Sequence, residues 1–181
     1  MKEKIRYQAI RLFDKNGFHG TSMRDIGEAA GCKTPTVYHY YESKEKLFDE
    51  VVRVAYVNLL DDLRKQLPEI IAPQDYCAAV IIQKKQLSED DMLVHRVAMK
   101  TWLGCEGCEE VRQKIIEWET SRNTRNEALL SYILLSNIWA KIITRTFMNL
   151  VERIILFNED IADDEIREEI RLLFEAATKI N

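Results

Sequence analysis

The 181-residue sequence contains few residues that interrupt helices, with only three prolines and six glycines. Each proline stands where a helix boundary is expected: Pro35 opens one helix, and Pro68 and Pro73 bracket a break. No segment alternates between apolar and polar residues as a half-buried strand would. The sequence therefore predicts an all-α fold of about nine helices, long enough for one or two small domains.

The sequence also lacks any run of apolar residues that approaches the roughly 20 needed to cross a bilayer. The charged start at Met1–Lys4 leads into an amphipathic segment rather than into the apolar centre of a signal peptide. We therefore expect a cytoplasmic protein with no membrane partner.

Catalytic motifs are missing as well. The sequence contains no phosphate-binding loop, no nucleophile elbow and no histidines at metal-binding spacing. The four cysteines include one close pair, Cys105 and Cys108, which lacks a second pair of metal ligands and stands beside several glutamates that disfavour the thiolate. We expect a protein that is not an enzyme and has no metal or cofactor. Two small residues at a turn explain the pair best, and a redox role remains the alternative.

Charge is distributed unevenly along the chain. The formal net charge is −4, but residues 1–48 hold nine Lys and Arg against six Asp and Glu, a net charge of +3. The remaining residues therefore carry −7. A weakly basic N-terminal region on an acidic remainder suits a protein that presents one end to a polyanion, and so few excess charges favour binding as a dimer.

Residues Ser22–Phe48 have the spacing of a helix-turn-helix. Gly27 would let two short helices cross closely, and Gly31 would supply the positive φ of the turn between them. Thr34 and Pro35 read as the N-cap and first residue of the second helix. Five side chains fall at inward positions of the two helices: Ile26, Ala30, Cys32, Val37 and Tyr40.

The stretch from Ile5 to Val52 resembles the N-terminal domain of TetR-type transcriptional regulators. The resemblance rests on three segments: Asn16–Phe18 with Thr21–Ser22, Ile26–Gly31, and Pro35–Tyr41 followed by Ser43–Leu47. It departs at Lys33, where many members have a Ser cap, and at Gly27, where Ala is usual. The resemblance implies a DNA-binding domain over residues 1–48 and a helical effector-binding and dimerisation domain over residues 49–181.

By the same resemblance we expect a dimeric, ligand-responsive repressor that binds a palindromic, double-stranded DNA operator and is released by a small, mostly apolar or aromatic effector. A regulator without a small-molecule ligand, either an activator or a sensor that uses Cys105 and Cys108, remains the alternative. The positions that match DNA-contacting positions of the family are Ser22, Arg24, Lys33, Thr34, Pro35, Thr36, Tyr38, His39, Tyr40 and Lys44. Physical chemistry gives them roles: Lys33 can donate to guanine, Pro35 can pack on a thymine methyl, and Lys44 can bind phosphate. Tyr40 could instead pack inward, and Arg24 and Lys33 could be plain solvated charges.

Helical patterns extend over the whole chain. The predicted helices cover residues 2–16, 22–29, 35–41, 44–66, 74–87, 91–103, 106–125, 127–157 and 163–179. The fourth is long and starts at Ser43, a good N-cap, so it would form a mechanical link between the two predicted domains.

Two C-terminal segments predict a homodimer. Residues 127–157 are apolar around most of the helical circumference, which requires cover on nearly all sides. Apolar residues of the last helix, from Ile166 to Ile180, step by four and three as in a coiled coil. The expected interface residues are Ile138, Ile142, Ile166, Ile170, Leu173 and Ala177. Alternatively, both helices close the core of a monomer.

The effector pocket is expected among large, adaptable side chains in the second domain. Met99, Trp102, Trp118 and Trp139 are the predicted lining residues, because Met and aromatic side chains suit an irregular apolar cavity. His95 could supply a polar contact. Residues with this spacing are also typical of an ordinary core.

Overall fold

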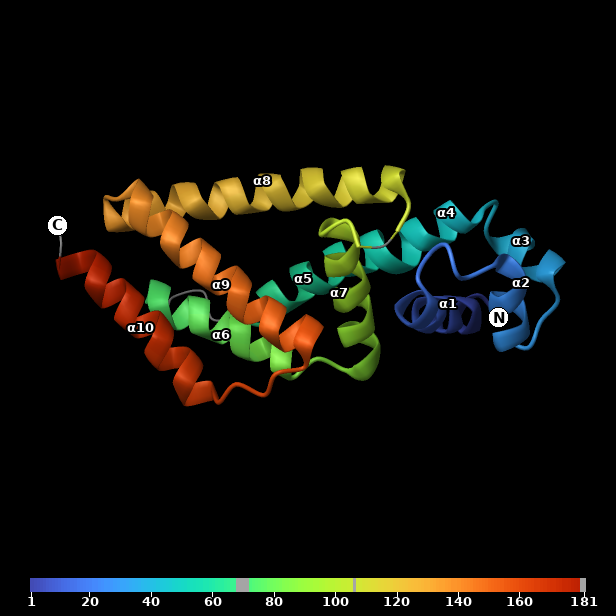
Figure 1. The fold of residues 1–181 in the computed structure, drawn as a ribbon, viewed down its shortest axis with the longest axis horizontal. Coiled ribbons are helices and arrows are strands. Elements are labelled where there is room, and N and C mark those ends of the chain that lie inside the picture. Colours follow the sequence, from blue (N-terminus) through green and yellow to red (C-terminus); the bar gives the residue numbers. More distant parts are fainter. Residues whose placement is uncertain (68–71, 106, 180–181) are drawn as a thin grey trace. The chain divides into compact units, whose positions relative to one another are not determined.

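The chain is helical throughout the part that its computed structural model describes, residues 1–67, 72–105 and 107–179, and no strand occurs in these ranges (Figure 1). The elements are α1 (Lys2–Asn16), α2 (Met23–Ala29), α3 (Thr34–Tyr40), α4 (Lys44–Phe48), the π-helical η1 (Asp49–Val54), α5 (Ala55–Lys65), α6 (Pro73–Lys85), α7 (Glu89–Trp102), α8 (Glu109–Leu134), α9 (Asn137–Phe157) and α10 (Asp163–Lys179). This confirms the all-α prediction. None of the helices described here is both long and apolar enough to cross a bilayer. Pro68, Glu106 and Ile180 lie outside the described residues.

The predicted helix positions are correct to within a few residues, except at one junction. A break was expected at residue 126, but α8 continues to Leu134 and α9 begins at Asn137. The turn lies where Leu135 adopts a left-handed φ of 52° and Ser136 caps α9 by accepting a hydrogen bond from the backbone N–H of Trp139 at 3.4 Å. Nothing at residue 126 ends a helix, whereas Ser136 supplies a cap.

The described chain forms two compact units. Unit 1 comprises residues 1–60 and 88–117, and unit 2 comprises residues 61–87 and 118–181, so α5 and α8 each contribute residues to both. This division differs from the expected boundary after residue 48. The reason is that α7 packs on α1, which brings a later helix into the unit that contains the helix-turn-helix.

Ion pairs reinforce the packing of α7 on α1. The Asp14 carboxylate lies 3.2 Å from the Lys100 ammonium and 3.5 Å from the Arg96 guanidinium, and all three side chains are largely buried. At the other end of the contact, Arg11 pairs with Glu89 at 3.0 Å. Partly buried charges are screened less by salt than exposed ones, so the Asp14 contacts hold the two helices together more firmly than surface pairs would.

The segment α4–η1–α5 forms one uninterrupted helix over Lys44–Lys65, as the sequence predicts. Its middle is π-helical, which the sequence did not indicate. Within this stretch the Arg53 guanidinium donates two hydrogen bonds of 2.6 Å to Asp49, and these contacts lower the pKa of the Asp49 carboxyl. Short π-helical segments are uncommon and occur often at functional sites.

Lys44 fixes the start of this long helix on the turn between α1 and α2. Its ammonium donates to the backbone oxygens of Phe18 at 2.8 Å and Thr21 at 2.9 Å, and it lies over the Phe18 ring at 4.2 Å. The Phe18 ring in turn packs edge-on against Phe48 at 5.0 Å. Lys44 therefore has an intramolecular role in addition to the phosphate contact that is predicted for it.

In unit 2, α10 packs on α6 and α9. Ile166, Ile170 and Ala177 are completely buried within the protomer, while Leu173 is half-buried. The expectation that these four residues form a dimer interface is therefore wrong for the three buried ones, because their seam already covers the unit's own helices. The alternative, that α10 closes the protomer core, accounts for them.

We expect Ile170→Ala to lower the free energy of unfolding by about 2–5 kcal/mol, because it leaves a cavity in the core of unit 2. Urea denaturation would measure the change. Leu172→Ala is the matched control, since Leu172 is about half-exposed on the same helix (51%) and should change stability little. Equal effects of the two substitutions would contradict the buried seam.

We expect Lys44→Ala to lower the free energy of unfolding by about 1.5–3 kcal/mol, because it leaves two carbonyl groups without their charged donor. Lys46→Ala serves as control, since the Lys46 side chain is exposed two residues along the same helix. Urea denaturation compares the two variants. A Lys44→Ala protein as stable as the wild type would show that the ammonium does not hold the turn.

Candidate nucleic-acid interface

The helix-turn-helix depends on the absence of a side chain at Gly27. A Cβ atom there would lie 3.1 Å from the Cys32 carbonyl oxygen and 3.2 Å from a methyl carbon of Val37, closer than most such contacts. Gly31 has a φ of 70°, which gives the turn its left-handed residue. Ile26 and Val37 are fully buried between the helices and Ala30 is nearly so, as the spacing predicts.

The two helices begin with different caps. Ser22 caps α2 in a capping box: its hydroxyl accepts from the Asp25 N–H, and its own N–H donates to the Asp25 carboxylate at 2.9 Å. The Ser22 hydroxyl also donates to the Asp25 carboxylate at 2.7 Å, and this bond, together with the one from the Ser22 N–H, lowers the pKa of Asp25. The N-cap of α3 is Lys33, with no side-chain cap, so the prediction that Thr34 caps this helix is wrong by one residue. The Lys33 side chain is consequently exposed and unengaged in capping.

The exposed side of α3 gathers most of the predicted DNA contacts. Lys33, Pro35, Tyr38 and His39 are exposed, and Thr34 and Thr36 are half-buried. Within two turns, this helix therefore presents the Lys33 ammonium, the threonine hydroxyls and the rings of Tyr38 and His39 at or near the surface. Such a helix has the groups required to donate hydrogen bonds to base edges and phosphates and to touch a thymine methyl group.

Tyr40 is exposed and its neighbour Tyr41 is buried, although the helix-turn-helix spacing puts Tyr40 at an inward position. Tyr40 is 40% exposed, so its prediction as an inward residue is wrong, and its hydroxyl is available to a ligand. Tyr41 is buried instead, and its hydroxyl donates to the Glu50 carboxylate at 3.1 Å. Burial and the nearby Glu50 charge raise the pKa of Tyr41. Because α3 ends at Tyr40, Tyr41 leaves the helical register and turns into the core.

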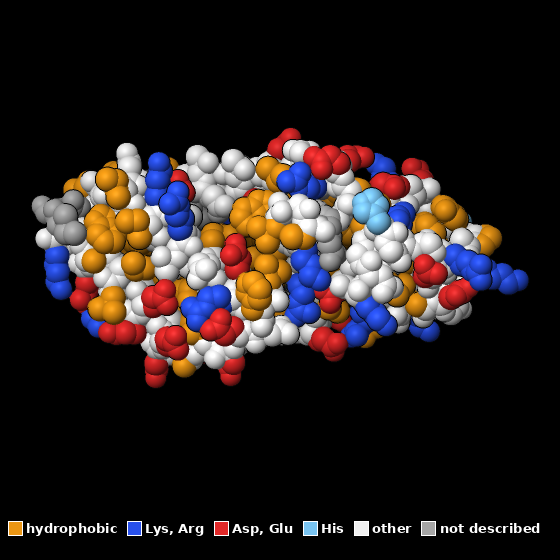
Figure 2. Space-filling model, in the orientation of Figure 1, with side chains coloured by type: hydrophobic (Ala, Val, Ile, Leu, Met, Phe, Trp, Pro, Cys, Tyr) orange, Lys and Arg blue, Asp and Glu red, His pale blue; other side chains and the backbone are white. Residues whose placement is uncertain are grey.

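Two predicted cations of the interface have partners within the chain. Arg24 on α2 is exposed and pairs with Glu28 at 2.8 Å one turn on, a contact that DNA phosphate could replace. Lys44 donates to two carbonyl oxygens, which leaves one of its three N–H groups for a phosphate. On the face drawn in Figure 2, Lys and Arg side chains project at the end of the molecule that contains α2 and α3.

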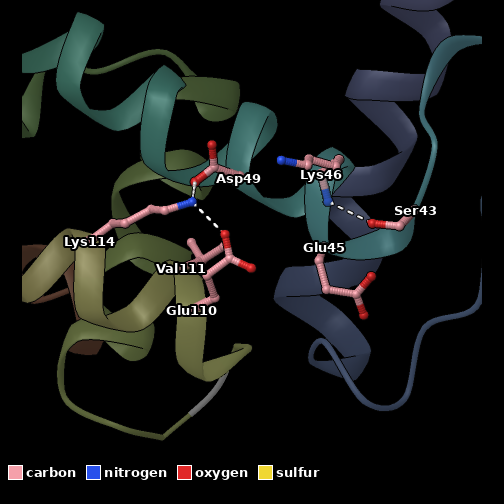
Figure 3. Close-up of a pocket in the computed structure, with 7 residues that line it drawn as sticks. All are labelled: Ser43, Glu45, Lys46, Asp49, Glu110, Val111 and Lys114. Carbon is pink, nitrogen blue, oxygen red and sulfur yellow. Dashed lines mark hydrogen bonds and ion pairs between the residues drawn. The ribbon is translucent and has the colours of Figure 1, made fainter.

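A small charged cavity lies beside the start of α4 (Figure 3). Its volume is about 200 Å³. In the close-up, Lys114 of α8 extends between Asp49 and Glu110, at 3.9 and 2.7 Å respectively. The remaining lining residues are Ser43, Glu45, Lys46 and Val111. Because its charges are already paired with one another, this cavity does not resemble a pocket for an apolar effector.

The predicted effector residues are divided between the two units. Met99 and Trp102 lie on α7 in unit 1, where Met99 is buried, while Trp118 and Trp139 are half-buried in unit 2. None of the four lines the charged cavity. A second cavity of about 330 Å³ in unit 2, between the starts of α6 and α10, is also lined by other and mainly charged residues. His95 is buried on α7 and packs edge-on against the Tyr56 ring at 5.0 Å.

Two of the four cysteines have surroundings that disfavour the reactive thiolate. Burial raises the pKa of Cys108, with the Glu45 and Glu110 charges acting in the same direction, and burial raises the pKa of Cys77 to about 11. Cys105 is exposed. Within the described ranges, no group of three or more His, Cys, Asp or Glu side chains is arranged to hold a metal ion.

Residues 5–51 match the model of the family described as bacterial regulatory proteins, tetR family. The HTH-type transcriptional repressor KstR2 of Rhodococcus jostii is 41% identical over 64 residues, which are 35% of this chain and 29% of that protein. The biofilm operon icaADBC negative transcriptional regulator IcaR of Staphylococcus epidermidis is 33% identical over 63 residues, 35% of this chain and 34% of that protein. The matched region thus spans about a third of each of these relatives.

Solved structures resemble nearly the whole chain. A TetR-family transcriptional regulator from Bordetella parapertussis has a TM-score of 0.71 at 21% identity, covering 96% of this chain and 93% of that one. AibR, crystallised with isovaleryl coenzyme A and operator DNA, has a TM-score of 0.68 at 19% identity, with 95% and 97% covered. At these identities the similarity establishes the fold. The match over residues 5–51 shows that the N-terminal region is similar to the tetR family of bacterial regulatory proteins.

Proposed function

We propose that this protein is a dimeric transcriptional repressor that binds a palindromic operator through α3 and is released by a small-molecule effector. The observation that carries the DNA-binding part is the exposed face of α3, held by Gly27 and Gly31 in a tight helix-turn-helix. The relatives KstR2 and IcaR, named as a repressor and a negative regulator, match this chain over that region and support the direction of regulation.

In this proposal the N-terminal end of α3 enters the major groove. Lys33 donates to a guanine edge and Pro35 packs on a thymine methyl, while Tyr38 and His39 contact a base edge or a phosphate. Arg24 on α2 exchanges Glu28 for a base or phosphate. The phosphate anchors are Ser22, Thr34, Thr36, Tyr40 and the remaining N–H of Lys44.

An exposed apolar surface on α8 and α9 supports the dimer. It consists of six exposed side chains and is called the α8–α9 patch below: Leu129, Tyr132, Ile133, Leu135, Ile138 and Ile142. Figure 2 shows hydrophobic side chains gathered where these two helices meet. Contiguous apolar surface of this kind is typical of an interface. The proposed interface therefore includes Ile138 and Ile142, which the sequence also predicts, but not the buried residues of α10.

An effector response is supported by two observations. AibR, which has the same fold, was crystallised with both isovaleryl coenzyme A and operator DNA. In this chain, α7 is bound to α1 through Asp14, so a displacement of α7 would be transmitted to the helix-turn-helix. We propose that the effector contacts either Met99 and Trp102 of α7 or Trp118 and Trp139 of unit 2, and that its binding changes the affinity for DNA.

We expect Lys33→Ala to weaken operator binding by about 1–3 kcal/mol per half-site and to relax the base preference at one position of each half-site. Sites selected from random DNA, followed by fluorescence anisotropy at fixed salt, would measure both effects. Lys65→Ala, which removes an exposed lysine of unit 2, should leave binding unchanged. Selection of asymmetric sites only would contradict the dimeric binding mode.

We expect Ile138→Glu to convert the dimer into folded monomers, because it places a charge in the centre of the α8–α9 patch. The Ile138 side chain is 73% exposed in the protomer, so its replacement should not disturb the protomer core. Sedimentation equilibrium measures the association, and circular dichroism verifies the fold. Leu103→Glu, at an exposed leucine of unit 1, is the control that should remain dimeric. A dimeric Ile138→Glu protein would place the interface elsewhere.

A further inference from the structure

One carboxylate oxygen, Oε1 of Glu50, lies where three segments of unit 1 meet. The Tyr41 hydroxyl donates to it at 3.1 Å, from the residue that directly follows α3. The Lys2 ammonium of α1 lies 3.1 Å from the same oxygen, and the Arg6 guanidinium lies 3.7 Å from it. Glu50 itself belongs to η1. This carboxylate therefore connects α1, the end of α3 and the long helix that begins at Lys44.

Tyr41 is bound to α3 as well as to Glu50. Its backbone N–H donates to the Val37 carbonyl oxygen at 3.0 Å, which continues the hydrogen bonding of the helix by one residue. The Tyr41 side chain is buried. A movement of Tyr41 would therefore move the last turn of α3, and that turn contains Tyr38 and His39, both proposed to contact DNA.

Helix α3 has little other packing to fix its orientation. Among its seven residues, Thr34–Tyr40, only Val37 is buried. The helix packs chiefly on α2, and α2 in turn packs on α1. A short helix with so few buried contacts is easily displaced unless a second point holds it. The hydrogen bond between Tyr41 and Glu50 supplies that point, because it connects the end of α3 directly to η1.

Of the contacts that Glu50 makes, the hydrogen bond from Tyr41 should contribute most. A hydrogen bond to a charged acceptor is roughly twice as strong as one between neutral groups, and the Tyr41 side chain is buried. The side chains of Lys2 and Arg6 are 45% and 36% exposed, and ion pairs open to solvent contribute little. Burial and the Glu50 charge raise the pKa of Tyr41, so its hydroxyl keeps its proton and remains a donor at neutral pH.

We propose that Glu50 is a positioning residue for operator recognition, which fixes the orientation of α3 through the Tyr41 hydroxyl and thereby sets the preference for the operator over other DNA. This inference rests on the proposed operator binding and concerns the selectivity of that same surface. Base contacts carry the sequence information, and their hydrogen bonds form only within a narrow range of distance and angle. Phosphate contacts come largely from long, flexible side chains that can follow a tilted helix. A loosened α3 should therefore lose base preference and keep its general affinity for DNA.

The test measures selectivity, which is the ratio of the affinities for the selected operator and for random DNA of the same length, with the full-length protein at fixed salt. Tyr41→Phe removes only the hydroxyl, and Glu50→Ala removes its acceptor. Each should lower the selectivity about tenfold, chiefly through weaker operator binding. Glu50→Gln removes the charge but keeps an acceptor oxygen, and it should retain the selectivity to within about threefold. Unchanged selectivity in Tyr41→Phe, or a loss in Glu50→Gln as large as in Glu50→Ala, would overturn the proposal.

A double-mutant cycle separates this positioning role from a general weakening of the fold. If Glu50 acts through the Tyr41 hydroxyl, the combination of Tyr41→Phe with Glu50→Ala lowers the selectivity no further than either substitution alone, whereas additive losses would overturn the proposal. Glu3→Ala is the matched control, because it removes an exposed carboxylate that pairs with Arg6 on the same helix, and it should leave the selectivity unchanged. Circular dichroism verifies that each protein is folded at the temperature of the measurement. If Glu50→Ala does not fold, Tyr41→Phe and Glu50→Gln decide the question.

Failure of this inference is distinguishable from failure of the proposed function. If the wild type prefers no sequence over random DNA, the proposed operator binding fails, and the positioning role fails with it. If the wild type is selective and Tyr41→Phe is equally selective, the operator binding stands and only the positioning role fails.

Discussion

The ion pairs of Asp14 with Arg96 and Lys100 are the contacts on which unit 1 depends. They explain why a helix more than 70 residues later in the chain belongs to the same compact unit as the helix-turn-helix. Lys100 also donates to the Asp14 backbone oxygen at 3.3 Å, so the end of α1 is held by both its side chain and its main chain. Without these contacts, the Arg11–Glu89 pair at the start of α7 and apolar packing would have to keep the register of α7 on α1.

The loop before α8 adds a second close contact to the same unit. Gly107 has a φ of 100°, and a Cβ atom there would lie 2.7 Å from Thr101 and 3.3 Å from the Phe48 ring. Phe48 is the last residue before the π-helical turn. The helix over Lys44–Lys65 is therefore fixed at its start by Lys44. The loop contacts it at Phe48, where the helix changes from α-helical to π-helical. A π-helical turn adjoining such a contact can absorb small shifts of the helix without breaking it.

The sequence predicts the fold well because local signals determine most of it. Caps at Ser22, Ser43 and Ser136 mark helix starts, and the spacing of Ile26, Gly27 and Val37 defines the helix-turn-helix before any tertiary contact is known. The cap at Ser136 marks the start of α9. The break predicted at residue 126 is wrong, because no cap or glycine stands there.

The sequence is less informative wherever a residue's role depends on distant partners. The apolar spacing of α10 is the same for a dimer seam and for a core helix, and only the positions of α6 and α9 show that Ile166 and Ile170 face the chain's own core. Tyr40 and Tyr41 are adjacent, and the end of α3 decides which of them is buried. Periodicity places a side chain on a face, but it does not identify what that face meets.

The strength of the contacts between α7 and α1 also bears on how a ligand could change DNA binding. An effector changes operator affinity only if it binds the two states of the protein differently, and typical coupling free energies are about 1–3 kcal/mol. Partly buried charge pairs such as those of Asp14 are comparable in strength to this range, so displacing α7 would move α1 before it broke the contact.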